Sequence, residues 1–198
     1  MVPRLHVTDL GRAVLRWLDT LNENNFDVLG GHLANALASC QLRNPTEEGR
    51  DYDNSVVVFP FVFIWRAMLE LDWKINSEEL SRAIFKVTDE NSLAIAINKI
   101  MEARVSNDRE TMGPPVQTVN DRIIPWMSMA SFGWTLFGDK ELGGEAKGYY
   151  VVPEKSRPLL RSAVAIRRKH RDYDGEADSV AKYVERISMS AALPKDIR

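Results

Sequence analysis

The sequence predicts a mainly α-helical protein with one small β-hairpin. Apolar residues recur at helical spacing in most of the chain, and capping or breaker residues divide it into short helices. Two β-rich runs, Trp134–Phe137 and Tyr149–Val152, flank a glycine-rich turn and predict the hairpin. We expect an N-terminal helical segment over residues 1–54, a central domain over 55–152 and a C-terminal basic helical extension over 153–198.

The composition allows one elaborated domain or two small ones, with 198 residues of which 44% are apolar and 27% charged. Cys40 is the single cysteine, so the chain has neither an internal disulfide nor a CxxC zinc pair. The first residues lack the apolar run of a signal peptide. The longest apolar stretch, Ser55–Trp65, is too short to span a bilayer. We therefore expect a protein of the reducing cytoplasm with no membrane association.

The N-terminal segment begins with a short β-type alternation followed by a helix, within Arg4–Leu18. This strand has no preceding partner, so we expect that the chain is a fragment or that the strand pairs with a distant segment. A second helix is expected over Phe26–Gln41, and Asn44–Asn54 reads as a polar loop.

The densest apolar stretch runs from Val56 to Leu71. Proline disfavours the α conformation in its predecessor and suits the first turn of a helix, so Pro60 predicts a helix start. This helix is apolar nearly all round, which predicts a central, buried position. Asn76 and Glu79 have the spacing of a capping box, which predicts the start of the next helix.

A further, inserted helix is expected to begin at Asp89 or Asn91. Its predicted inward-facing residues are Leu93, Ile97, Ile100 and Met101. Ser106–Pro115 is rich in polar residues, glycine and proline, and is expected to be a mobile loop or a linker.

A helix capped by Thr118 or Asn120 follows, although Pro125 is tolerated only near its first turn. After it come the first β-rich run, the turn Gly138–Gly148 and the second β-rich run. Helix, strand, charged hairpin, strand is the order in which a winged helix-turn-helix ends. The predicted fold is therefore a winged helix-turn-helix with helical extensions.

The C-terminal extension is expected to hold a helix over Glu154–Arg171, a polar break over Asp172–Glu176 and a last helix from Ala177 to about Met189. The first of these helices is the most basic segment of the chain. Its inward positions are expected to be Leu159, Leu160, Ala163 and Val164.

Charge is unevenly distributed, with a net charge of −5 over residues 1–115 and +3 over residues 116–198. The asymmetry places any nucleic-acid surface in the C-terminal half. Side chains expected near base edges precede or begin the predicted reading helix: Gln117, Thr118, Asn120 and Arg122. Expected phosphate or groove contacts are Lys140 and Lys147 in the wing and the basic run Arg167, Arg168, Lys169 and Arg171.

An ordinary structural interpretation remains open for each of these features. The predicted reading helix and wing have the composition of a helical hairpin with a polar cap and turn. The basic run equally suits a solvated helix end, where cations complement the helix dipole.

The sequence shows no catalytic centre. It contains no P-loop, GxSxG, HExxH or Rossmann glycine pattern. The histidines lie in three separate segments, and Cys40 lies on an apolar helical face, so neither type predicts a metal ligand or a nucleophile. The loop acid pairs Asp51/Asp53 and Asp172/Asp174 suit a divalent ion, but solvated loop charge is the stronger reading. We expect no metal and no cofactor.

The chain resembles the winged-helix recognition region of the type II restriction endonucleases grouped with AlwI. The segments that carry the resemblance are Phe59–Leu71, Ile75–Val87, Lys99–Arg104 and Asn120–Trp134, together with the opening Val7–Leu15. It covers residues 2–152. The resemblance implies a DNA-recognition portion whose nuclease centre lies elsewhere in a longer polypeptide or on a partner subunit.

The expected function is sequence-specific binding of double-stranded DNA as the recognition part of a restriction-type system. The alternative is a helical protein-interaction or oligomerisation module, favoured by the net charge of −2 and the apolar run at Val56–Trp65. A nuclease using the loop aspartates ranks last. The sequence leaves a homodimer open.

Overall fold

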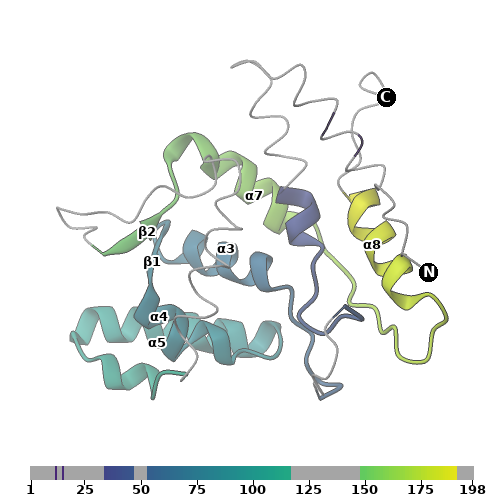
Figure 1. The fold of residues 1–198 in the computed structure, drawn as a ribbon. Coiled ribbons are helices and arrows are strands. Elements are labelled where there is room, and N and C mark those ends of the chain that lie inside the picture. The colour runs from purple at the N-terminus through teal and green to yellow at the C-terminus, as the bar shows by residue number, and fades with distance from the viewer. Residues whose placement is uncertain (1–11, 13–14, 16–33, 47–52, 117–147, 191–198) are drawn as a thin grey trace.

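The computed structural model describes residues 12, 15, 34–46, 53–116 and 148–190 of the chain (Figure 1). The helical elements within them are α3 (Pro60–Glu70), α4 (Ser77–Arg82), η1 (Ile84–Lys86), α5 (Glu90–Ser106), η2 (Arg109–Met112), η3 (Glu154–Ser156), α7 (Arg157–Ala165) and α8 (Ser179–Ser190). Two strands, β1 (Lys74–Asn76) and β2 (Tyr149–Val151), form one antiparallel sheet. The predicted mainly helical fold with a small sheet is confirmed. Of the predicted N-terminal strand and helix, only Arg12 and Leu15 are described, and both are helical. The helix after Asn120, the strand Trp134–Phe137 and the turn after it, apart from Gly148, lie outside the described residues.

α3 is the centre of the hydrophobic core, as its composition predicts. Phe63, Trp65 and Met68 are at most 1% exposed, and the helix packs against both α5 and α7 (Figure 1). Pro60 occupies the first turn, and Phe59 before it is extended, as the proline requires. The core also includes Ala34 and Ala38 from the described part of the predicted second helix, so all three predicted parts of the chain contribute to it.

Two capping boxes define the starts of α4 and α5. The Asn76 side chain accepts from the Glu79 N–H at 2.8 Å, and the Glu79 carboxylate accepts from the Asn76 N–H at 3.0 Å. Asp89 and Ser92 make the corresponding pair of bonds at the start of α5. Both helix starts lie within the predicted range because each depends on side chains only three residues apart.

The sheet joins two segments that lie far apart in the sequence. Ile75 pairs with Tyr150 in antiparallel register, and the Val152 N–H extends the pairing by donating to the Trp73 carbonyl at 2.9 Å. The strand at Tyr149–Val151 confirms the predicted β-rich run. Lys74, which lies between α3 and α4, begins β1 because a distant strand supplies its hydrogen bonds.

A buried ion pair ties the sheet to the helices around it. Glu79 is 3% exposed, and it accepts from Arg104 Nε at 2.7 Å and from Nη2 at 2.9 Å. Arg104 also donates to the carbonyls of Leu71 and Lys74. Burial acts to lower the pKa of Arg104, but the hydrogen bonds and charge of Glu79 raise it above its ordinary value. The pair therefore joins α5 to the start of α4, the end of α3 and β1.

Two expectations for the middle of the chain were wrong. Met101 is 41% exposed rather than inward-facing, because α5 turns Leu93, Ile97 and Ile100 toward the core. Ser106–Pro115 was expected to be a mobile loop or a linker, but η2 folds it into an ordered turn against α5. Met112 in η2 is 7% exposed, so its buried side chain helps to hold this polar segment against the rest of the fold.

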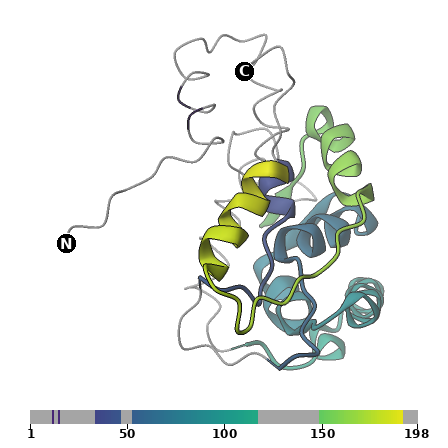
Figure 2. The same cartoon turned by 90° about the vertical axis from the view of Figure 1, so that its right-hand side faces the viewer.

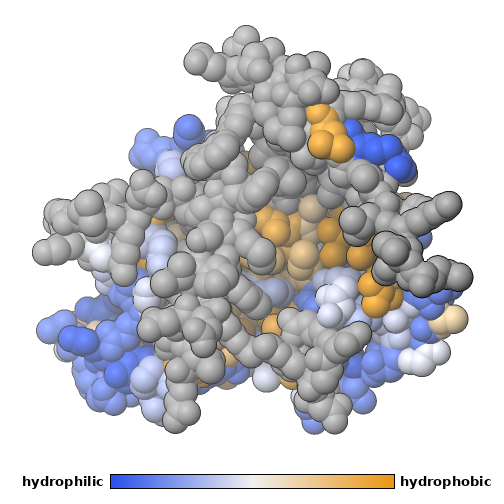
Figure 3. Space-filling view, viewed as in Figure 1, coloured by the Kyte–Doolittle hydropathy of each residue, from blue (hydrophilic) through white to orange (hydrophobic). Residues whose placement is uncertain are grey.

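The C-terminal elements pack back onto the rest of the fold. α7 lies against α3 through Leu160 and Ala163, which are buried as predicted. The chain then runs along the side of the molecule to α8 (Figure 2). Figure 3 shows hydrophilic residues gathered over the part of one face where α5 and η2 lie, with apolar residues visible at its centre.

Candidate nucleic-acid interface

Four of the ten predicted interface residues can be placed in the structure. The residues expected near base edges, Gln117, Thr118, Asn120 and Arg122, lie outside the described residues, as do Lys140 and Lys147. The C-terminal basic run Arg167, Arg168, Lys169 and Arg171 lies within them. Its geometry is therefore the part of the prediction that can be compared with the fold.

The basic run is not helical, which corrects the predicted helix over Glu154–Arg171. α7 ends at Ala165, and Ile166 has extended backbone angles. Arg168 Nη1 donates to the carbonyls of Ala163 at 2.6 Å and Ile166 at 2.9 Å. Burial lowers the pKa of Arg168. Arg168 thus satisfies the end of α7, as in the alternative in which cations complement a helix C-terminus.

Gln41 holds the residues after α7 in place. Its side-chain Nε2 donates to the Arg171 carbonyl at 2.8 Å, and its Oε1 accepts from the Arg171 N–H at 3.0 Å. One amide side chain thus satisfies both main-chain groups of Arg171, as a neighbouring strand would. Gln41 is 2% exposed, and its own N–H donates to the Tyr183 hydroxyl oxygen of α8 at 2.9 Å. These long-range bonds replace helical bonds that the local sequence alone would favour.

His170, within the same segment, packs against its neighbours and is not fully exposed to solvent. Its ring lies edge-on to that of Phe59, with 6.2 Å between the centroids. Burial lowers the pKa of His170, and the nearby charge of Arg43 lowers it further. The side chain is therefore a neutral packing group at neutral pH and adds no charge to the basic run.

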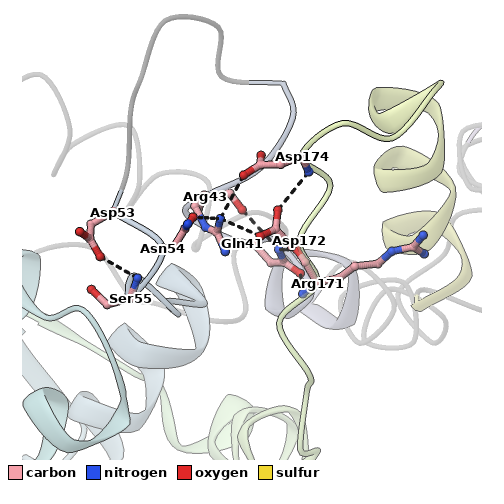
Figure 4. A network of polar contacts seen from close by, with 8 residues as sticks. All are labelled: Gln41, Arg43, Asp53, Asn54, Ser55, Arg171, Asp172 and Asp174. Carbon is pink, nitrogen blue, oxygen red and sulfur yellow. Dashed lines mark hydrogen bonds and ion pairs between the residues drawn. The ribbon is translucent and has the colours of Figure 1, made fainter.

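Arg43 draws the following acid pair into a polar network (Figure 4). Its Nη1 lies 3.1 Å from an Asp172 carboxylate oxygen, 3.5 Å from one of Asp174 and 2.8 Å from the Asn54 side-chain oxygen. The Asp174 N–H donates to Asp172 at 3.0 Å, and this bond, with the Arg43 contact, holds the pKa of Asp172 below its ordinary value. The arrangement links the two loops through structural carboxylates.

This network favours the structural reading of the acid pairs over a cation site. Asp172 and Asp174 already have a cationic partner in Arg43. Asp53 accepts from the Ser55 N–H at 2.8 Å, while Asp51 lies outside the described residues. Within the described ranges, no group of three or more histidine, cysteine or acidic side chains is placed to hold a metal ion.

Cys40 behaves as a packing residue. It is half-buried against the hydrophobic core, and burial raises the pKa of its thiol to about 11. The thiol is therefore protonated at neutral pH, whereas a nucleophilic cysteine needs a lowered pKa.

The cations of the basic run fall into two groups. Arg168 caps α7, and Arg171 pairs with Glu176 at 3.0 Å while lying over the Tyr173 ring. Arg167 and Lys169 are exposed, and neither makes an ion pair within the part of the chain that the structure describes. The run therefore offers two available charges and two that serve the fold.

A second group of cations was not singled out from the sequence. The guanidinium groups of Arg157 and Arg161 lie over the indole of Trp73, and Lys74 and Arg104 lie over the ring of Tyr149. The spacing of Arg157 and Arg161 places both on one side of α7. That spacing was the available signal, but nothing local indicates that Trp73, more than 80 residues earlier in the chain, supplies the ring.

Comparisons of the chain with protein-family models, with curated proteins and with solved structures found no match. Among the described residues, no helix has the length and apolar character needed to cross a membrane.

Proposed function

We propose that this chain binds double-stranded DNA in a sequence-specific manner, as the recognition part of a restriction-type system. The observation that carries the proposal is the surface segment after α7. Gln41 holds it in an extended form, and Arg167 and Lys169 project from it without carboxylate partners among the described residues. Cations in such a position neutralise backbone phosphates and release counterions, which is the main source of affinity for DNA.

The small sheet supports a winged-helix reading. Tyr149–Val151 is a strand, as the last strand of a wing must be, and it pairs with β1 directly before α4. In the proposal the bases are read by Gln117, Thr118, Asn120 and Arg122, which precede the wing. Phosphate contacts carry affinity and orientation, whereas these side chains carry sequence preference.

The nuclease centre of such a system would lie outside this chain, on another domain or a partner subunit. The described acid pair Asp172/Asp174 forms ion pairs with Arg43 and does not support a nuclease centre in this part of the chain. The resemblance to the AlwI group motivates this part of the proposal.

The direct test is selection from a random-sequence duplex library at two salt concentrations. The proposal expects enrichment of related sequences and retention that falls as salt rises. Arg122→Ala should relax the enriched sequence, while Lys140→Ala should weaken all sequences about equally. If no sequence is enriched and retention does not depend on salt, the DNA-binding proposal is refuted.

The second candidate is a helical interaction module, and one observation favours it. Ile95, Met101 and Val105 of α5 are 58%, 41% and 89% exposed, and they lie on the helix face turned away from the core. Exposed apolar side chains on a surface helix can form part of a contact surface. This candidate expects self-association in sedimentation velocity that Met101→Lys abolishes, with no effect of DNA.

A further inference from the structure

We propose that Arg157 and Arg161, whose guanidinium groups lie over the indole of Trp73, form an oxyanion site that binds a phosphate of the DNA backbone. This inference rests on the proposed function for the source of the phosphate. The site itself stands on geometry that involves none of the residues used above for DNA binding. It adds a contact surface on α7 to the segment that follows that helix.

Two positive charges share one aromatic surface in this site. The guanidinium carbon of Arg161 lies 5.1 Å from the centroid of the Trp73 ring, and that of Arg157 lies 5.5 Å from it. Both distances are within the range of a cation–π contact. Like charges four residues apart on a helix repel each other, so the pair is favourable mainly when an anion lies near both.

The aromatic platform is held rigidly. Trp73 is 5% exposed and has a φ of 61°, directly after Asp72 with a φ of 60°. A bulky residue in the left-handed region is strained and persists only where its surroundings enforce the conformation. Here the Trp73 N–H donates to the Met68 carbonyl at 2.6 Å and its carbonyl accepts from Val152. The indole therefore cannot easily turn away from α7.

The two arginines lack the close carboxylate that six other described arginines have. Arginines with a carboxylate within 3.5 Å are Arg43, Arg66, Arg82, Arg104, Arg109 and Arg171. Arg157 donates to the Val152 carbonyl and is 3.9 Å from Glu154, whose side chain is 89% exposed. Arg161 is exposed and has no ion pair within the described ranges.

Stacking and missing partners together favour a phosphate ligand. A guanidinium that lies over a ring still has N–H donors at its edge, and phosphate oxygens bind such donors in pairs. The stack also restricts the rotamers of the long side chain, which reduces the entropy lost on binding.

Salt-dependent DNA binding tests the site quantitatively. Fluorescence anisotropy is measured with a 20-base-pair duplex at 50 and 200 mM salt for the full chain. The site makes one phosphate contact, so Arg157→Gln/Arg161→Gln should lower the ratio of the two affinities by about 3.5-fold. The matched control Lys99→Gln removes an exposed charge from α5 and should leave the ratio unchanged.

A second measurement does not depend on DNA or on the folding of a variant. Inorganic phosphate is titrated into the wild-type chain while the Arg Nε–Hε signals are followed by NMR. Saturable shifts of the Arg157 and Arg161 signals are expected, with the signal of Arg104, which is bound to Glu79, unmoved.

The two measurements separate failure of the site from failure of the proposed function. Phosphate-induced shifts in a chain that binds no DNA would retain the oxyanion site and refute the DNA proposal. DNA binding whose salt dependence is identical in the double variant and the wild type would overturn the phosphate-backbone assignment. Absence of phosphate-induced shifts together with unchanged salt dependence would overturn the site itself.

Discussion

Glu79→Ala is expected to be among the most destabilising single substitutions outside the apolar core. Glu79 serves two purposes, since it closes the capping box at the start of α4 and pairs with Arg104 from α5. Alanine removes both contacts at once. It also leaves the guanidinium of Arg104 in place at the carbonyls of Leu71 and Lys74, without a counter-charge.

The size of the effect follows from burial. The Glu79 side chain is 4% exposed and that of Arg104 is 23% exposed. Removing one partner of a buried ion pair costs about 3–5 kcal/mol. Because the guanidinium keeps some contact with water and two carbonyl partners, we expect about 3 kcal/mol, near the lower limit of that range. Glu79→Gln keeps an acceptor for the Asn76 N–H and should cost about 1–2 kcal/mol.

Urea unfolding followed by circular dichroism measures these values as shifts of the midpoint at constant slope. The double variant Glu79→Ala/Arg104→Met completes a cycle, and we expect the two sites to couple by about 2 kcal/mol. Glu78→Ala is the matched control, because its more exposed pairs with Arg82 and Arg109 should contribute about 1 kcal/mol or less. A loss below about 1 kcal/mol for Glu79→Ala, or additive single effects, would refute the reasoning.

Three further predictions concern the C-terminal contacts. Burial lowers the pKa of His170 below its unfolded value, so the unfolded chain binds more protons. The free energy of unfolding should therefore rise between about pH 5.5 and 7, and His170→Phe should flatten that rise. An identical pH profile for the variant and the wild type would contradict the assignment. Gln41→Met leaves the Arg171 N–H and carbonyl without partners, so it should lower the free energy of unfolding by about 2 kcal/mol. It should also remove hydrogen-exchange protection at the Arg171 amide. Unchanged protection would show that another group holds the segment. With a pKa of about 11, Cys40 should react with a disulfide reagent far more slowly at pH 8 in the folded chain than in urea, and equal rates would show that the thiol is not buried.

Local signals in the sequence predicted the features that depend on near neighbours. Pro60 marks the start of α3 because a proline needs no N–H in the first helical turn. Asn76 with Glu79 marks the start of α4, since both partners of its capping box lie within one turn. The buried positions of α7 and the existence of α8 follow in the same way from helical periodicity.

The positions of charged groups were less predictable, because each depends on a distant partner. The composition of Arg167–Arg171 favours a helix. The carboxamide of Gln41 instead hydrogen-bonds the Arg171 N–H and carbonyl, and α7 ends at Ala165. The acid pair Asp172/Asp174 and Arg43 are about 130 residues apart in sequence and meet in one network. Hydrophobic periodicity does not predict contacts between residues so far apart in the sequence.

The sequence by itself determined the helical class, the central position of α3 and the starts of its neighbours, because burial periodicity and capping act over a few residues. Only the tertiary structure decided which cations remain available. Arg168 and Arg171 are bound within the fold, whereas Arg157 and Arg161 face Trp73 without a close carboxylate. The reason is physical: a charge is neutralised by whatever the fold brings within a few ångströms, and that neighbour lies far along the chain.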